Sequence, residues 1–176
     1  MNINYKLNLF HDLEQKYVSI ARNNPEEFDR LISAILVIEN LNRSILWRLL
    51  EYIAVLYEII FHKYITNYSI WRCQVKISMI FDYYNIEYKT YGKYLYYKRV
   101  SKLRLIFLLF KDNYIPIIKN ALYSKFGEID MNNLNYKELE DIALYYSRNL
   151  EFNDEINYYS IIRHLYYDSF ASLAQR

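Results

Sequence analysis

The sequence predicts a mainly α-helical fold, a single-domain helical bundle spanning residues 1–176 with at most one β-hairpin. Only two glycines and two prolines occur in the chain, too few for the many turns of a β-rich fold. Apolar residues make up 53% of the chain, and this length is sufficient for a substantial core. Most segments repeat their apolar residues at helical spacing.

Residues 44–65 are predicted to form a central buried helix around which the bundle is built. Two apolar stripes run along this segment. The first consists of Leu46, Leu49, Ile53, Leu56 and Ile60, and the second of Trp47, Leu50, Ala54, Tyr57 and Phe61. A surface helix has one apolar stripe and a broad polar face, so a helix with two stripes is expected to have neighbours on both sides.

Two helices are expected before this segment. The first covers residues 6–22, with Tyr17 on its buried edge. The second begins at Pro25, which suits a first helical position and follows Asn24 as a capping residue, and it continues to about Glu39.

A fourth helix is expected from Ser69 to Tyr84. Residues 86–99 alternate β-favouring residues on both sides of Gly92, which is typical of a hairpin. A competing interpretation starts a helix at Lys93, so residues 93–100 are either strand or helix, while 102–111 are helical in both cases.

Three further helices complete the prediction. Pro116 opens one that ends at Gly127, a residue suited to a left-handed helix end. Another covers residues 136–148, and Asp154 caps a last helix that runs nearly to the C-terminus.

Basic residues are concentrated in one stretch. Residues 88–111 contain seven cations and no acid, in a chain of formal net charge +2, and five tyrosines are interleaved with them. Cations neutralise phosphates and aromatic rings stack on bases, so the stretch predicts DNA or RNA binding. A solvated basic face is the structural alternative. The cations are Lys89, Lys93, Lys98, Arg99, Lys102, Arg104 and Lys111.

The order of elements over residues 44–102 resembles a winged helix-turn-helix: a helix, a short turn, a second helix and a basic hairpin. In that layout the second helix enters the major groove and the hairpin contacts the backbone. The resemblance implies that Arg72, Gln74 and Lys76 face the groove. It rests on layout alone, without a residue motif.

A helical protein–protein interaction module is the second functional hypothesis. The C-terminal part is acidic, which suits self-association or a basic partner. Twenty-two tyrosines offer aromatic anchors for an interface. Tyr, Ile, Asn, Lys and Phe are also the residues of AT-rich codons, so the composition favours a virus, phage or plasmid origin. An interaction module from such a source would be, for example, an assembly subunit or an inhibitor.

Enzymatic readings find little support in the sequence, and we expect no catalytic activity, no cofactor and no metal site. The pairs Glu58–His62 and His164–Asp168 have i, i+4 spacing and are expected to be helix-surface ion pairs. Cys73 is the single cysteine, which excludes an internal disulfide. Neither a signal peptide nor a membrane span of about 20 apolar residues is visible, so a soluble, cytoplasmic protein is expected.

Overall fold

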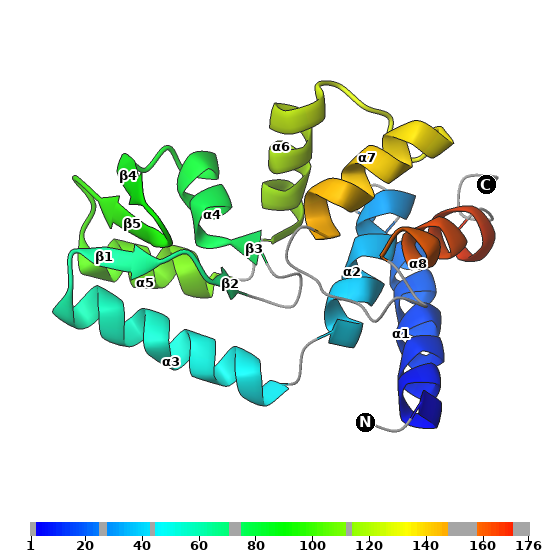
Figure 1. Ribbon diagram of the computed structural model, residues 1–176, viewed down its shortest axis with the longest axis horizontal. Helices are drawn as coiled ribbons and strands as arrows, with labels where there is room; N and C mark the ends of the chain where they lie inside the picture. Colours follow the sequence, from blue (N-terminus) through cyan, green and yellow to red (C-terminus); the bar gives the residue numbers. More distant parts are fainter. Residues whose placement is uncertain are drawn as a thin grey trace. The chain divides into compact units, whose positions relative to one another are not determined.

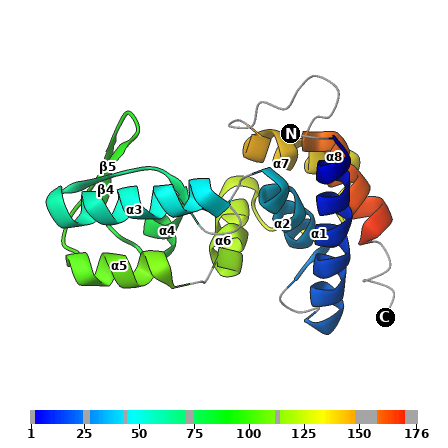
Figure 2. The ribbon, with the colours of Figure 1, turned by 90° about the horizontal axis from the view of Figure 1, so that it is seen from below.

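A computed structural model of the chain describes residues 3–24, 28–42, 45–70, 75–111, 114–147 and 158–170. The chain divides into two compact units (Figures 1 and 2). The first unit combines Met1–Asn42 with Lys125–Arg176, and the second unit is Arg43–Ser124. Whether the whole chain folds as one cooperative domain stays a prediction.

The first unit is helical and contains the most deeply buried helix of the described chain. Its elements are α1 (Ile3–Asn23), α2 (Arg30–Asn42), α7 (Tyr136–Ser147), α8 (Tyr158–His164) and the π-helix η1 (Leu165–Ser169). α1, α8 and η1 all pack against α2, and every α2 residue from Leu31 to Glu39 is buried. The buried central helix is therefore α2.

The start of α2 is set by a residue distant in the sequence. The Asn132 side-chain oxygen accepts a hydrogen bond from the Arg30 backbone N–H at 3.0 Å, and its amide nitrogen donates to the Asp29 carboxylate at 3.1 Å. Asn132 thus satisfies a donor that the first helical turn leaves free. The expected start at Pro25 was too early, since the helix begins at Arg30; Pro25 itself lies outside the described residues.

Two consecutive tyrosines of η1 hold the loop before α7. The Leu134 backbone N–H donates to the Tyr166 hydroxyl at 2.7 Å, and the Tyr167 hydroxyl donates to the Leu134 carbonyl at 2.8 Å. Tyr166 is 1% exposed, and burial raises the pKa of its phenol to about 12. Folding of the unit therefore favours the neutral form of the Tyr166 phenol over the ionised form.

We predict that Tyr166→Phe lowers the free energy of unfolding at pH 7 by about 1–3 kcal/mol, because the buried Leu134 N–H loses its acceptor. The difference between wild type and variant should hold below about pH 10, the pKa of an unfolded tyrosine. It should shrink as the pH rises from there through about 12, the folded pKa of Tyr166, since the folded state resists ionisation and the unfolded state does not. Urea unfolding followed by circular dichroism at pH 7 and pH 11 measures both effects.

Tyr136→Phe is the matched control, because Tyr136 lies in the same unit and is 58% exposed. Its cost should stay within about 0.5 kcal/mol at both pH values. Equal costs for the two variants would contradict the assignment of Tyr166 as a buried acceptor.

The second unit combines helices with two small antiparallel sheets. Its elements are α3 (Ile45–Phe61), β1 (Tyr64–Thr66), β2 (Ser69–Ile70), β3 (Val75–Lys76), α4 (Ile77–Tyr83), β4 (Tyr88–Tyr91), β5 (Tyr94–Tyr97), α5 (Lys102–Phe110) and α6 (Tyr114–Phe126). The larger sheet has the strand order β1-β5-β4, and β2 pairs with β3. α3 packs against β1 and α5 (Figure 1).

The predicted hairpin of residues 86–99 is confirmed, with strand rather than helix over residues 94–97. Gly92 lies in its turn with φ +58°, a conformation that glycine adopts without steric cost. Leu95 and Ile65 form a cross-strand pair on the buried side of the sheet, and both are 0% exposed.

The fourth helix begins later than the sequence predicted. Residues 69–70 and 75–76 pair as strands, and the helix starts at Ile77 rather than Ser69. The Asn67 side chain accepts a hydrogen bond from the Ser78 N–H at 2.9 Å and donates to the Ser78 hydroxyl at 3.1 Å, so this asparagine caps α4 from outside the helix.

The orientation of α3 also differs from the prediction. Val55 and Ile59 are its buried side chains, whereas Ile53 is 55% and Trp47 64% exposed. Both apolar stripes predicted for the interior therefore lie largely at the surface. The reason is that α3 rests on a small sheet along one narrow line and is not surrounded by helices.

The fold class is confirmed: the chain is mainly α-helical with a hairpin between its helices. The described residues also include a second antiparallel strand pair, β2 and β3, which was not predicted. The predicted helices at 6–22, 102–111, 116–127 and 136–148 correspond to α1, α5, α6 and α7. Gly127 follows α6 with φ +78°, as expected of a left-handed helix end. Asp154, the predicted cap of the last helix, lies outside the described residues.

Candidate nucleic-acid interface

The outer face of the β1-β5-β4 sheet carries a row of tyrosines. The strand register places Tyr64 beside Tyr96, and Tyr94 beside Tyr91. Side chains alternate between the two faces of a strand, so these four residues share the face opposite the buried Leu95. We call this face, together with His62, the aromatic surface.

The rings of the aromatic surface form one connected network. Tyr64 contacts Tyr94 and Tyr96 with ring centroids 5.0 and 5.4 Å apart, and Tyr91 lies edge-on to Tyr96 at 5.3 Å. His62 stacks on Tyr64 at 4.8 Å with an angle of 19° between the rings. Tyr91 is 60% and Tyr96 39% exposed, so part of this network is open to a ligand.

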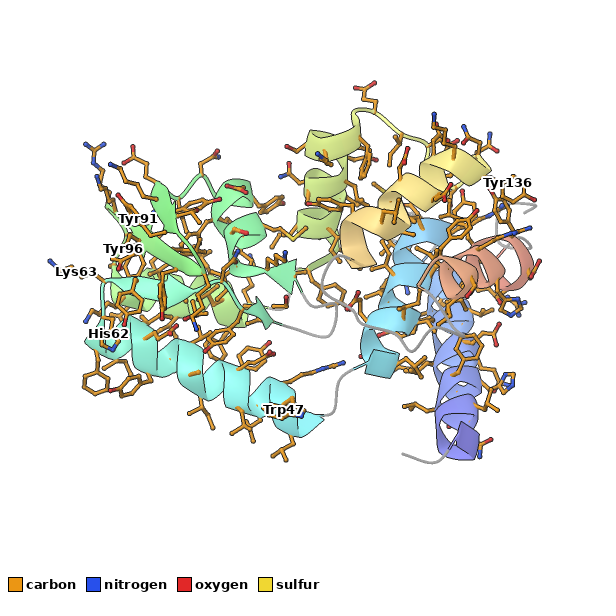
Figure 3. All side chains as sticks on the ribbon, viewed as in Figure 1. Trp47, His62, Lys63, Tyr91, Tyr96 and Tyr136 are labelled. Atoms are coloured by element: carbon orange, nitrogen blue, oxygen red, sulfur yellow. The ribbon has the colours of Figure 1, made fainter. Side chains whose placement is uncertain are left out.

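Cations surround the aromatic surface. The register places Lys89 beside Tyr96, Lys93 lies in the hairpin turn with its ammonium 5.4 Å from the centre of the Tyr94 ring, and Lys63 directly precedes β1. All three lysines are exposed. Figure 3 shows Lys63, His62, Tyr96 and Tyr91 gathered at one end of the second unit.

Charge divides between the two units. The second unit contains 13 Lys and Arg against 5 Asp and Glu, a formal charge of +8, and the first contains 9 against 15, a formal charge of −6. These add to the net charge of +2 of the whole chain. The aromatic surface therefore lies on the unit whose net charge attracts an anionic ligand.

The Tyr64 phenol is held in its neutral form. The pKa of Tyr64 is raised above its ordinary value, first by desolvation and then by the neighbouring Tyr94. A neutral phenol can stack on a base without repelling the adjacent phosphates.

Three of the other predicted cations form a second group at the other end of the hairpin. Lys98, Arg99 and Arg104 line a hollow of about 170 Å³ together with Glu87. Arg99 is 3.6 Å from the Glu87 carboxylate and has a positive φ of 55°, a conformation unusual for a residue other than glycine.

Lys102 lies at the first position of α5, after the capping residue Ser101. Its ammonium donates to the Ile60 carbonyl. This lysine therefore joins α5 to the end of α3 as well as contributing positive charge.

Of the three residues predicted to face a DNA groove, the structure describes one, and that residue lies on a strand and not on a helix. Lys76 is the second residue of β3, and Arg72 and Gln74 lie outside the described residues. The helix that follows, α4, contains Asp82 and neither lysine nor arginine. The correspondence with a winged helix-turn-helix is thus limited to the hairpin and its position after a helix.

Sequence reasoning missed β1, and with it His62, Lys63 and Tyr64. This segment follows an apolar helix and was expected to be its fading end. Its pattern of alternating residues is only three residues long, too short to identify a strand.

A carboxylate positions β1. The Glu58 side chain accepts two hydrogen bonds from Thr66, one from the backbone N–H at 2.7 Å and one from the hydroxyl at 2.6 Å. Glu58 was expected to pair with His62, but its carboxylate is used by Thr66, and His62 stacks on Tyr64 instead. The link ties the last turn of α3 to the sheet.

The first unit has a polar hollow of about 390 Å³, lined in part by Tyr136, Arg163, His164 and Asp168. The expected pairing of His164 with Asp168 is confirmed by a distance of 2.8 Å between Nδ1 and Oδ2. Arg163 lies over the Tyr136 ring at 5.0 Å. These contacts pair four of the lining residues with one another.

No protein-family model, curated protein or solved structure matches this chain. Among the described residues, His, Cys, Asp and Glu side chains nowhere gather in a group of three suited to a metal ion. None of the described helices combines the length and apolar character needed to cross a bilayer.

We predict that Glu58→Gln lowers the free energy of unfolding by about 1.5–3 kcal/mol, the range for hydrogen bonds to a charged group. The amide nitrogen of glutamine is a donor and cannot replace the carboxylate oxygen that it substitutes. Urea unfolding followed by circular dichroism gives the value.

Glu87→Gln provides the comparison, since Glu87 forms an ion pair with Arg99 on an exposed surface. It should cost less than about 1 kcal/mol. If the two glutamine variants unfold alike, the Glu58–Thr66 link does not stabilise the unit as described.

Proposed function

We propose that this protein binds single-stranded DNA or RNA across the aromatic surface of its second unit, as a binding protein without catalytic activity of its own. The observation that carries the proposal is the connected network of Tyr64, Tyr91, Tyr94 and Tyr96 on one face of a sheet. Bases of a single strand are free to stack on exposed rings, whereas those of a duplex are already stacked.

The arrangement of cations supports the same ligand. Lys89 belongs to β4 and Lys93 to the hairpin turn, the elements that carry Tyr91 and join it to Tyr94, and Lys63 directly precedes β1. Ammonium groups at the border of an aromatic face can contact phosphates while the bases stack. The α4 helix, with Asp82 as its charged residue, offers no comparable contact to a duplex groove, so a single strand is favoured over a duplex.

We expect Tyr96→Leu to weaken binding of a short single-stranded oligonucleotide by about 5- to 150-fold, since one base–aromatic stack contributes about 1–3 kcal/mol. Leucine retains an apolar side chain but removes the π face. Fluorescence anisotropy at low ionic strength, with RNA and DNA probes of mixed sequence, measures the change.

Tyr96→Phe is the control, because it keeps the ring and removes only the hydroxyl. Its affinity should stay close to that of wild type, and a duplex of the same sequence should bind more weakly than the single strand. Equal binding by the leucine and phenylalanine variants, or an absence of binding to any strand, would rule out the stacking surface.

Salt dependence tests the cations separately from the rings. With Lys63, Lys89 and Lys93 each neutralising one phosphate, the slope of log affinity against log salt should be about −2, since each contact on a single strand contributes about −0.7. The double variant Lys89→Ala, Lys93→Ala should flatten the slope by about 1.4, and the effect should not depend on base sequence.

Lys137→Ala is the matched change on the first unit, where Lys137 is exposed in α7. It should leave the slope unchanged. If it flattens the slope as much as the double variant does, the attraction reflects overall charge and not the three lysines at the aromatic surface.

The competing hypothesis, a tyrosine-rich surface that anchors another protein, uses the same exposed rings. It predicts that Tyr96→Leu disrupts a protein complex and that oligonucleotides fail to bind at any ionic strength. Lys89, which pairs with Tyr96 in the strand register, favours the nucleic-acid ligand, because charged residues are depleted at the core of protein interfaces.

A further inference from the structure

One side of α3 presents a continuous apolar surface to solvent. Of the 17 large apolar side chains exposed among the described residues, eight belong to this helix of 17 residues, at exposures of 47–65%. We call them the α3 face: Leu46, Trp47, Leu49, Leu50, Ile53, Tyr57, Ile60 and Phe61. Trp47 is seen near the start of α3 in Figure 3.

The α3 face contains no charged residue. The polar residues of the helix lie elsewhere on it: Arg48, Glu51 and Glu58 are partly buried, and Glu58 is bonded to Thr66. A surface helix normally directs its charges outward, so α3 has the polarity expected of a helix whose outer side is covered.

We propose that a second copy of this chain covers the α3 face, and that the two α3 helices pack antiparallel about a two-fold axis near Ile53. This proposal goes beyond nucleic-acid binding and uses different residues from the aromatic surface. Three observations favour a second copy as the occupant: the spacing of the face, its internal symmetry and its size.

The spacing is that of helix-to-helix packing. Leu46, Leu49, Ile53 and Ile60 of the α3 face, together with the half-buried Leu56 at its edge, recur at alternating intervals of three and four residues over two heptads, the pattern that one helix offers to another in a coiled coil. Two helices that each carry such a row can contact each other along the whole length of the row.

The row is symmetric about Ile53. Leu46 and Ile60 are each seven residues from it, Leu49 and Tyr57 are each four, and Leu50 and Leu56 are each three. A two-fold axis brings residue i opposite residue j and j opposite i, so an antiparallel pair centred on Ile53 places an apolar residue opposite an apolar residue at every one of these positions.

The size of the face suits a stable dimer. At about 100 Å² of apolar surface for each half-exposed large side chain, the eight residues offer about 800 Å² per copy, which is about what one partner contributes to a standard protein interface. On α5, which packs beside α3, Leu103 and Phe107 are 81% and 64% exposed and can extend the contact.

Sedimentation equilibrium on the full chain tests the proposal. Wild type should have twice the chain mass of 21.7 kDa at tens of micromolar, and high salt should not dissociate it, since apolar contacts are not screened. Ile53→Glu should give the mass of one chain with an unchanged circular dichroism spectrum.

Leu7→Glu is the matched control, because Leu7 is 52% exposed on α1 and Ile53 is 55% exposed; it should leave the dimer intact. A wild type of single-chain mass would overturn the proposal. A dimer that survives Ile53→Glu would overturn it too.

Thiol cross-linking tests the antiparallel register independently of any destabilising charge. In a Cys73→Ser background, Leu46→Cys and Ile60→Cys should cross-link with each other when the two proteins are mixed and equilibrated, because the axis brings these positions together. Leu46→Cys alone should not cross-link with itself, since the two copies of position 46 would lie about 21 Å apart along the helix axis. Self-cross-linking at position 46, or no cross-linking in the mixture, would overturn the arrangement.

The outcome is separable from that of nucleic-acid binding. Ile53→Glu should leave the affinity of one chain for a single strand unchanged, while Tyr96→Leu should leave the dimer mass unchanged. Failure of one proposal therefore leaves the other standing.

Discussion

The geometry of the second unit depends on the link between Glu58 and Thr66. Two hydrogen bonds to one carboxylate attach the edge strand β1 to the last turn of α3, and β1 then pairs with β5. Three-residue strands are too short to hold themselves in place. Tyr64 is the first residue of β1, so the Glu58 carboxylate that holds this strand also sets the position of the Tyr64 ring. The ring contacts with His62, Tyr94 and Tyr96 depend on that position.

The second unit presents two surfaces of different chemistry. The aromatic surface combines rings with lysines, which suits a ligand that has both flat bases and charged phosphates. The α3 face has neither charge nor hydrogen-bonding groups apart from the Trp47 and Tyr57 side-chain donors, which suits another apolar surface. The Tyr57 ring contacts His62 with centroids 5.8 Å apart, so the two surfaces adjoin at the end of α3. A protein that pairs through one and binds a strand through the other would display two aromatic surfaces for one nucleic-acid chain, which increases avidity by raising the effective concentration of the second site.

The spacing of apolar residues predicted that α3 is a helix but not which of its sides is buried. Apolar spacing correctly identified the helix and both of its stripes, but it could not say whether the stripes face the same chain or another molecule. Burial of an apolar residue lowers the free energy in either case, so the pattern is the same for a core helix and for an interface helix. Only the packing of Val55 and Ile59 shows that a third, narrower line of the helix faces the sheet.

The sequence alone determined the helical class, the helices of residues 102–111 and 136–148, and the concentration of cations near Gly92. It indicated a hairpin around Gly92 but left residues 93–100 as either strand or helix. These features follow from local composition and spacing, which act within a few residues. The tertiary structure decided where α2 and α4 begin, because Asn132 and Asn67 cap them from outside each helix. It also decided which lysines accompany the tyrosines, since strand pairing places Lys89 on one side of Tyr96 and Tyr64 on the other, while Lys98 and Arg99 fall at the other end of the hairpin. Contacts between residues far apart in the chain arise only when the elements pack, and no local pattern records them.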